Sequence, residues 1–326
     1  MSRIYYIFSN GRMKRQDNTI YLENEYGEKK SIPIEDVDHI HIFGEMDMNT
    51  KLMNFLSQNG VMLHFYNYYG YYAGSFMPRR KNVSGDLTVK QVQNYLNKQK
   101  RLYIAYQFID SAVFHILRNL RNYDGVEEFI SDIEKERNLL NGIQSIQELM
   151  GIEGRIRNIY YQAFNVFLRD DFKMEKREMN PPSNPINALI SFGNSLMYQV
   201  VLSEIYHTQL DPTISFLHEP SERRYSLSLD ISEIFKPLIV DPIIFKLINN
   251  RVLTLDDFDE DLNYCYLKED GRKKFIKEFD DKLKTTIMHR KLKRKLSYRG
   301  FIRQECYKLI KHLLGDEDYK PLKAWW

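Results

Sequence analysis

The sequence is poor in cysteine and has no long apolar run. Its 326 residues include two cysteines, Cys265 and Cys306, which cannot build a disulfide framework or a four-cysteine zinc site. No stretch approaches the roughly 20 apolar residues that a membrane-spanning helix needs. The first apolar run, IYYIF, is too short for the core of a signal peptide. These absences argue against a disulfide-rich or membrane protein, and they predict a soluble, cytoplasmic protein with no membrane partner.

Net charge is also small, at +3, but cations are concentrated in one segment. From Lys282 to Lys311 there are 11 Lys and Arg and one acid, Glu305, which gives 11 − 1 = +10. Aromatic residues interrupt this tract, and such a mixture suits nucleic acid, because cations neutralise phosphates and rings pack on bases. A solvated helix face is the alternative. The acidic run LDDFDEDL lacks the glycine and spacing of an EF-hand, so we interpret it as a solvated loop.

Local patterns predict an α+β protein with a small, mostly β N-terminal domain and a larger, all-α C-terminal domain. Residues 1–76 contain the short β-rich runs RIYYIF, TIYLENE, KSIPI and HIHIF, one helix from Asn49 to Gly60, and a hairpin around Tyr69-Gly70. Residues 77–87 carry proline, glycine and three consecutive cations, which predicts a linker.

Apolar periodicity in residues 88–326 predicts the helical domain. One long helix or two should cover Thr88 to about Arg121. Further helices are expected over Val126–Leu140, Ile146–Leu168, Asn187–His207, Asp230–Asn250 and Lys268–Leu314.

Four polar residues from three segments of this domain form a candidate site. Glu153 lies beside the apolar stripe of its helix, so it can face a cleft, or it can simply pair with Arg157 four residues on. His218 lies in a turn, where a purely structural histidine is the alternative. Asp230 and Glu233 are spaced to share one helix face, as a common metal requires, but also to form a capping box. Two or three carboxylates with one imidazole suit a divalent metal that acts on phosphate.

Longer motifs carry a resemblance to a known family. The runs NPPSNPINALISFGNSLMYQVVLSEI, LDPTISFLHEP and RRYSLSLDISEIFKPLIVD, together with MGIEGRIRNIYY and GSFMPRR, resemble the CRISPR-associated protein one family. Members of this family insert new spacers into CRISPR arrays. The motifs are long and in the same order, and the resemblance covers nearly the whole chain.

The resemblance implies a metal site formed by Glu153, His218 and Glu233, with Asp230 as a second ligand or supporting acceptor. It implies Mg²⁺ or Mn²⁺ as the cofactor. It also implies a homodimer that works with CRISPR-associated protein two and joins the 3′-OH ends of double-stranded DNA into CRISPR repeat DNA. The cations expected to contact DNA are Arg79, Arg80, Lys81, Arg290, Lys293 and Arg294.

Three other functions remain open at this stage. A transposon-type integrase and a stand-alone metal-dependent DNA nuclease would use the same site chemistry. A non-catalytic DNA-binding scaffold would instead use Glu153 as an ion-pair partner of Arg157, and Asp230 as a helix cap. The C-terminal run LKAWW is expected to form an exposed apolar patch or a docking peptide.

Overall fold

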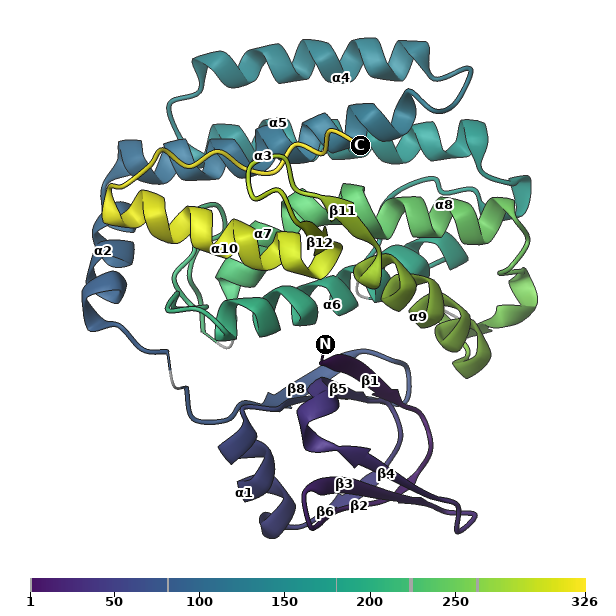
Figure 1. Cartoon of the computed structure of the whole chain (residues 1–326). Helices are drawn as coiled ribbons and strands as arrows, with labels where there is room; N and C mark the ends of the chain where they lie inside the picture. Colours follow the sequence, from purple (N-terminus) through teal and green to yellow (C-terminus); the bar gives the residue numbers. More distant parts are fainter. Residues whose placement is uncertain (1, 81, 180, 223–224, 262–263) are drawn as a thin grey trace. The chain divides into compact units, whose positions relative to one another are not determined.

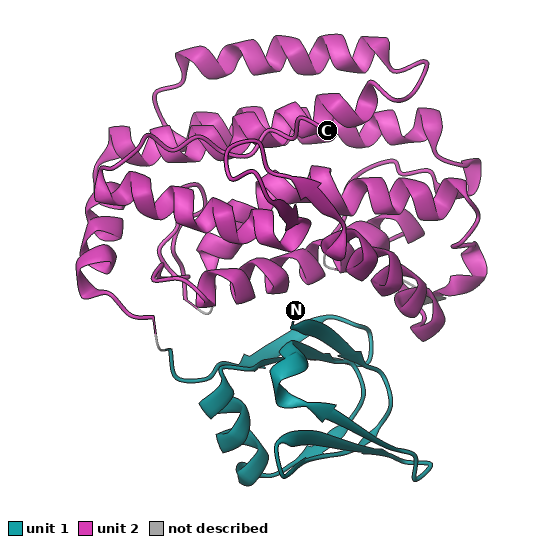
Figure 2. Cartoon of the chain, in the orientation of Figure 1, with its two compact units in different colours: residues 1–81 teal, residues 82–326 magenta. Residues whose placement is uncertain are grey.

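The computed structural model describes residues 2–80, 82–179, 181–222, 225–261 and 264–326. The chain divides into two compact units, residues 1–81 and residues 82–326 (Figure 2). The division falls inside the predicted linker, 77–87. Unit 1 is rich in strands and unit 2 is rich in helices, which confirms the predicted α+β class.

Over its described residues, 2–80, unit 1 contains two four-stranded sheets, one α-helix and a short 3-10 helix (Ile34–Asp36). The first sheet has the order β1-β5-β7-β8, in which β1 (Arg3–Ile7), β5 (Val37–Ile42) and β7 (Met62–Tyr66) are parallel and β8 (Tyr72–Phe76) is antiparallel to β7. The second sheet has the order β4-β3-β2-β6 and contains β2 (Gly11–Gln16), β3 (Thr19–Asn24), β4 (Lys29–Pro33) and β6 (Met46–Met48). The hairpin predicted around Tyr69-Gly70 is confirmed as β7–β8, whereas the sequence patterns missed β2 and β6.

Helix α1 (Thr50–Asn59) confirms the helix predicted from Asn49 to Gly60. The Asn49 side chain accepts a hydrogen bond from the Leu52 amide, and Gly60 ends the helix with a φ of 72°, a value that favours glycine. Leu52, Phe55 and Leu56 of α1 join inward-facing residues of both sheets in one apolar core.

Alternation along β5 explains why its two faces differ. Ile40 and Ile42 enter the apolar core, whereas His39 and His41 lie on the opposite face and are also buried. The His41 ring is hydrogen-bonded through Nδ1 to the Tyr66 hydroxyl at 2.7 Å.

Unit 2 is a helical assembly (Figure 1). Its helices are α2 (Gly85–Leu96), α3 (Lys98–Leu120), α4 (Glu127–Leu139), α5 (Ile146–Phe167), α6 (Pro185–Tyr206), α7 (Ser226–Phe235), α8 (Asp241–Asn249), α9 (Glu269–Lys284) and α10 (Tyr298–Leu314). The first predicted segment is two helices rather than one. The extended backbone of Asn97 ends α2, and its side chain caps α3 by accepting from the Lys100 amide.

Helix α6 is buried on nearly all sides, as its apolar sequence predicts. Helix α7 packs against α6 and α3. A π-helical turn (Lys236–Val240) connects α7 to α8. Pro237 lies in this turn, and because proline lacks an amide hydrogen and clashes with the preceding turn, the wider π geometry accommodates it. The predicted helix Asp230–Asn250 therefore begins earlier, at Ser226, and is not regular throughout.

Two predictions for unit 2 are wrong. The acidic run is not a plain loop, because its residues Phe258–Asp261 form β9, which pairs with β10 (Tyr264–Leu267). Asp257, just before β9, is buried and accepts hydrogen bonds from Lys274 at 2.6 and 2.9 Å. The predicted helix Lys268–Leu314 is interrupted by a hairpin of β11 (Thr286–Met288) and β12 (Lys295–Ser297). Unit 2 is thus mainly helical, with two short hairpins.

Cys265 and Cys306 are thiols rather than disulfide partners, and both are buried. None of the helices in the described chain combines the length and apolar character needed to cross a membrane.

Candidate functional site

The predicted site residues come from three segments of unit 2. Glu153 lies on α5, His218 lies in the turn before α7, and Asp230 and Glu233 lie on α7. Ion pairs connect Glu153 to Glu233 through Arg157, and a separate ion pair connects His218 to Asp230. Helix α7 carries one acid of each group, and the charge of Glu233 acts on His218, so we refer to the two groups together as the cluster. The Glu153 and His218 side chains retain 27% and 29% of their exposure, whereas Glu233 retains 5%. Solvent therefore reaches one edge of the cluster, and its other edge is buried.

Arg157 is the link between the two glutamates. Its Nε donates to Glu153 Oε1 at 3.0 Å, and its Nη2 donates to Glu233 Oε2 at 2.6 Å. The first bond is the i,i+4 pair anticipated from sequence, and the second joins α5 to α7. Burial alone would lower the pKa of Arg157, but the charges of Glu233, Tyr161 and Glu153 raise it well above its ordinary value. The guanidinium is therefore a permanent cation between two carboxylates.

Asp230 is a buried acceptor that shapes the turn containing His218. Its Oδ2 accepts from the amides of Phe216 and Leu217 at 2.6 and 2.9 Å, and its Oδ1 accepts from the His218 amide at 3.0 Å. Oδ1 also bonds His218 Nδ1 at 2.8 Å. Both oxygens of Asp230 are thus engaged by the turn, whereas it is Glu233 that Arg157 connects to Glu153.

The bond to Asp230 also fixes the orientation of the His218 ring. Burial lowers the pKa of His218, but the hydrogen bond from the ring to Asp230 and the charges of Asp230 and Glu233 outweigh it, so the pKa is raised. With Nδ1 held, Nε2 is the ring nitrogen left for a ligand or a proton.

Glu233 contacts a second cation, Lys236, whose Nζ donates to Oε1 at 2.5 Å. Burial would raise the pKa of Glu233, but the charges of Lys236, Arg157 and His218 lower it to about 2. Glu233 is therefore ionised at any physiological pH.

Asp241, the first residue of α8, extends the cluster on its buried side. Burial raises its pKa to about 6, although Arg157, the Tyr160 hydroxyl and Lys236 act in the opposite direction. Its Oδ2 has no hydrogen-bond partner within the described chain.

The capping-box interpretation of Asp230 and Glu233 is wrong. Helix α7 begins at Ser226, so both acids lie inside the helix rather than at its amino end.

The types of side chain in this cluster fit a hard divalent cation. Glu153, Glu233 and His218 offer carboxylate oxygens and one imidazole nitrogen, the donors that Mg²⁺ and Mn²⁺ accept. Within the described chain, Glu153 Oε2 and His218 Nε2 make no hydrogen bond. However, both oxygens of Glu233 are held by cations, and no three His, Cys, Asp or Glu side chains in the described ranges gather closely enough to hold an ion.

The predicted DNA-contacting cations fall into two groups. Arg290, Lys293 and Arg294 lie in the β11–β12 hairpin rather than on a helix face, and residues 290–295 are all exposed. Arg79 is exposed and Arg80 is half-buried in unit 1. Lys81 lies outside the described residues.

The C-terminal run LKAWW is not a free patch or docking peptide, because it packs on its own chain. Trp326 Nε1 donates to the Tyr298 hydroxyl at 2.7 Å, and the Arg290 guanidinium lies 5.0 Å from the centre of the Trp325 ring. The segment also contacts α3, where the Ala324 amide donates to His115 Nε2 at 3.0 Å. Figure 1 shows this yellow segment running along α3 to the C-terminus.

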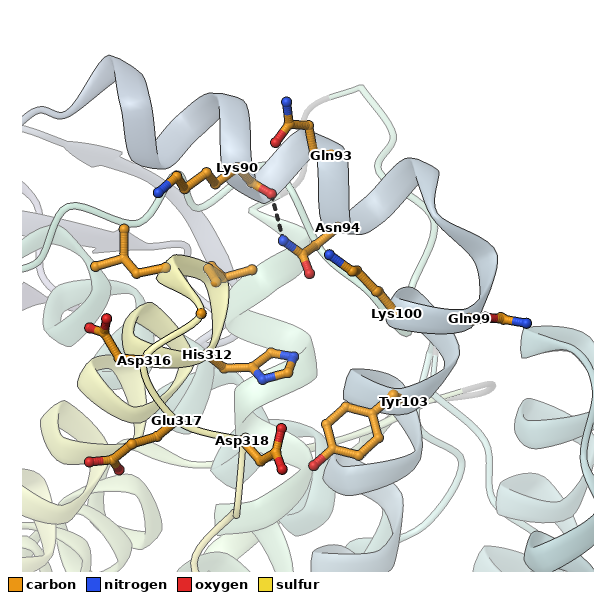
Figure 3. Close-up of a pocket in the computed structure, with 13 residues that line it drawn as sticks. Lys90, Gln93, Asn94, Gln99, Lys100, Tyr103, His312, Asp316, Glu317 and Asp318 are labelled. Atoms are coloured by element: carbon orange, nitrogen blue, oxygen red, sulfur yellow. Dashed lines mark hydrogen bonds between the residues drawn. The ribbon is translucent and has the colours of Figure 1, made fainter.

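A separate cleft of about 730 Å³ lies between α2, the start of α3 and the end of α10 (Figure 3). Its lining includes Lys90, Lys100, His312 and Asp318, and none of the predicted site residues. The cleft is therefore distinct from the carboxylate–histidine cluster.

Sequence reasoning missed the roles of Arg157, Lys236 and Asp241. Arg157 was visible only as a partner for Glu153, because its second partner is 76 residues away. The pairing of Lys236 with Glu233 could have been predicted from the sequence, because residues three apart on a helix are neighbours.

Comparisons with known proteins agree on one family. The model of the family described as "CRISPR associated protein Cas1" matches residues 5–281. The chain is 66% identical to "CRISPR-associated endonuclease Cas1 3" of Thermodesulfovibrio yellowstonii over 99% of this chain and 100% of that protein. It is 59% identical to "CRISPR-associated endonuclease Cas1" of Clostridium perfringens over the full length of both.

Solved structures show the same fold. A Cas1 protein from Thermotoga maritima, 40% identical, aligns with a TM-score of 0.86 over 97% of this chain and 98% of that one. A structure titled "Casposase bound to integration product", 20% identical, aligns with a TM-score of 0.84 over 99% of this chain and 94% of that one, a likeness of fold. On the family match and these full-length relatives, the chain belongs to the CRISPR-associated protein Cas1 family.

Proposed function

We propose that this chain is a metal-dependent DNA endonuclease and integrase of CRISPR adaptation. It joins the 3′-OH ends of short duplex DNA into a CRISPR repeat array, with Mg²⁺ or Mn²⁺ held by Glu153, His218 and Glu233. One observation carries the proposal: in a member of the Cas1 family, Arg157 draws the carboxylates of α5 and α7 together beside a histidine oriented by Asp230.

The reaction is a phosphodiester exchange. The 3′-oxygen of the incoming strand attacks a phosphorus of the repeat, one P–O bond forms, and the bond to the repeat's own 3′-oxygen breaks. The bound metal supplies Lewis-acid stabilisation of the charge that builds on the phosphate oxygens. With water in place of the 3′-OH, the same site cleaves DNA.

The protein's own residues supply orientation and charge. Asp230 fixes the 216–218 turn and the His218 ring, and Arg157 fixes Glu153 relative to Glu233. The attacking hydroxyl loses one proton and the leaving oxygen gains one, so the exchange needs no net proton. His218 Nε2 serves as a ligand in this proposal, and its raised pKa also suits a proton carrier.

The exposed β11–β12 hairpin supports contact with DNA. Five cations lie between residues 290 and 295, and no ion pair engages them in the described chain. We expect the triple variant Arg290→Gln, Lys293→Gln, Arg294→Gln to flatten the salt dependence of duplex binding, by about 0.9 in the log–log slope for each phosphate that is no longer neutralised. Fluorescence anisotropy at several salt concentrations measures the slope, and an unchanged slope would remove the hairpin from the DNA surface.

The proposal includes a homodimer that works with a Cas2 protein in the prokaryotic cytoplasm. A structure titled "Cas6-RT-Cas1--Cas2 complex" shares the fold at 16% identity and a TM-score of 0.86. Light scattering of the purified chain, alone and mixed with a purified Cas2 protein, tests both assembly states.

A joining assay tests the activity. Purified protein, with and without that Cas2 partner, is mixed with Mn²⁺ or Mg²⁺, a duplex labelled near its 3′-OH ends, and a supercoiled repeat-bearing plasmid. We expect label to enter the plasmid, and EDTA, Glu153→Gln and His218→Ala each to abolish transfer. Arg155→Gln, which alters an exposed arginine of α5 paired with Glu136, is the matched control and should retain transfer.

The assay also separates the alternatives. Metal-dependent nicking without transfer favours a stand-alone nuclease, and transfer into any plasmid without preference for the repeat favours a transposon-type integrase. Joining by a folded Glu153→Gln protein contradicts the assigned site. If neither activity occurs even with the partner, while DNA still binds, the protein is a scaffold.

A further inference from the structure

Glu233 shares its two oxygens between two buried cations. Arg157 Nη2 donates to Oε2 at 2.6 Å and Lys236 Nζ donates to Oε1 at 2.5 Å. The side chains of these three residues retain 5% to 11% of their exposure. A metal ion that uses Glu233 must therefore displace one of the two cations, and the structure distinguishes them.

Arg157 is the cation that is bound more strongly, because it pairs with two carboxylates. Its guanidinium bonds two carboxylates through two different nitrogens, and its planar fork keeps both bonds in one geometry. Removing it from Glu233 would leave two neighbouring carboxylates without the charge that holds them together. While Arg157 stays in place, it occupies Glu153 Oε1 and Glu233 Oε2, and it leaves Glu153 Oε2 and Glu233 Oε1 for another cation.

Lys236 is the cation that has a second favourable contact besides Glu233. Among the described residues its ammonium makes one ion pair, with Glu233, and it is carried on a flexible four-carbon chain. It also lies 5.0 Å from the centre of the Tyr198 ring on α6, and that ring face attracts a cation. An ammonium that leaves Glu233 Oε1 thus keeps a favourable contact.

We propose that Arg157 is a positioning residue that holds Glu153 and Glu233 together while the metal is bound, and that Lys236 neutralises Glu233 only until a divalent cation displaces it toward Tyr198. This inference rests on the proposed function, because it concerns the metal of that site. It predicts that the two basic residues have opposite effects on metal affinity.

The test is Mn²⁺ binding by the full-length chain without DNA, measured from the electron paramagnetic resonance signal of free Mn²⁺. Arg157→Lys keeps the charge but cannot bridge both carboxylates, so affinity should fall roughly 10–100-fold, the usual loss when a residue that orients metal ligands is removed. Lys236→Met removes the competing charge, and affinity should rise about tenfold or more, as Coulomb attraction across a few ångströms at intermediate dielectric allows.

Matched controls carry the same substitutions outside the cluster. Arg155→Lys alters an α5 arginine that pairs with Glu136, and Lys246→Met alters an α8 lysine that pairs with Glu278. Both should leave Mn²⁺ affinity unchanged. Tyr198→Leu removes the ring toward which the Lys236 ammonium moves, so this variant should bind Mn²⁺ more weakly than wild type. In a protein that already carries Lys236→Met there is no ammonium to move, so adding Tyr198→Leu should leave the Mn²⁺ affinity unchanged.

The outcomes separate this inference from the proposed function. If the wild type binds no Mn²⁺, or Glu153→Gln binds it equally well, the proposed metal site falls and the inference with it. A second outcome is that the wild type binds Mn²⁺, Glu153→Gln does not, and Lys236→Met binds more weakly than wild type. In that case the metal site stands, and only the displacement of Lys236 is refuted. Unchanged Mn²⁺ affinity in Arg157→Lys refutes the positioning role of Arg157. If circular dichroism shows that this variant does not fold, the affinities of Lys236→Met and Tyr198→Leu still test whether the metal displaces Lys236.

Discussion

Asp241 is a buried carboxyl that should make the helical unit less stable as the pH rises. Its side chain is 2% exposed, and Oδ2 has no hydrogen-bond partner within the described chain. We predict that Asp241→Asn, which keeps the shape of the side chain and a hydrogen-bonding group for Tyr160, stabilises the protein at pH 8. The reason is that asparagine carries no charge to be desolvated.

The magnitude follows from the change in pKa on folding. The pKa rises from 3.8 to about 6, and each unit corresponds to about 1.36 kcal/mol, so the full effect is about 3 kcal/mol. The folded state holds this proton more tightly than the unfolded state. The contribution of Asp241 to stability is therefore fully present below pH 3.8 and is lost as the pH rises through about 6, with roughly half of the loss between pH 5 and pH 8.

Urea unfolding followed by tryptophan fluorescence measures this effect. The two tryptophans, Trp325 and Trp326, both belong to unit 2, so the signal reports the unit that contains Asp241. The advantage of Asp241→Asn over wild type should grow by about 1.5 kcal/mol from pH 5 to pH 8. Asp86→Asn, an exposed change on α2, is the matched control and should alter stability little at either pH.

One result would refute this reasoning. If Asp241→Asn is less stable than wild type at pH 8, the ionised carboxyl stabilises the folded protein as a counter-ion of Arg157 instead of costing stability. If the difference in stability between Asp241→Asn and wild type does not change with pH, the pKa of Asp241 is the same in the folded and unfolded states, which also contradicts the reasoning.

Three further predictions concern packing and support. Gly193→Ala should destabilise unit 2 by about 1–3 kcal/mol, because the added Cβ would lie 2.5 Å from the Val240 side chain; urea unfolding would show otherwise if α6 can shift. Asp230→Asn should cost about 3–5 kcal/mol, since buried amides and the His218 ring lose a charged acceptor, and unchanged unfolding would contradict that support role. Deleting Trp325 and Trp326 should speed trypsin cleavage within residues 290–295, and an unaltered digestion rate would mean that the hairpin needs no anchor.

Local sequence patterns were sufficient where short-range physics decides the structure. The helix from Asn49 to Gly60 has its cap and stop in adjacent residues, and the hairpin at Tyr69-Gly70 has its turn between its own strands. The apolar sequence of α6 likewise indicated a buried helix, because burial on all sides leaves few polar residues. Motifs along the chain were sufficient for the family, which the comparisons confirm.

Patterns failed where local signals were ambiguous. The cations of residues 290–295 have the composition of a solvated helix, yet they occupy a hairpin that contacts Phe301 and Trp325. Asp230 and Glu233 have the spacing of a cap, yet the helix starts at Ser226. In both cases contacts with distant residues decide between two locally acceptable structures.

The sequence by itself determined the two-part architecture, the family and the residue types of the candidate site. Only the tertiary structure decided how those residues are connected. Arg157 meets Glu233 across 76 residues, Asp230 uses both oxygens to hold the turn of His218, and Lys236 occupies the remaining oxygen of Glu233. The physical reason is that buried charges must be paired, and the partner is set by which helices pack together rather than by neighbours in the chain.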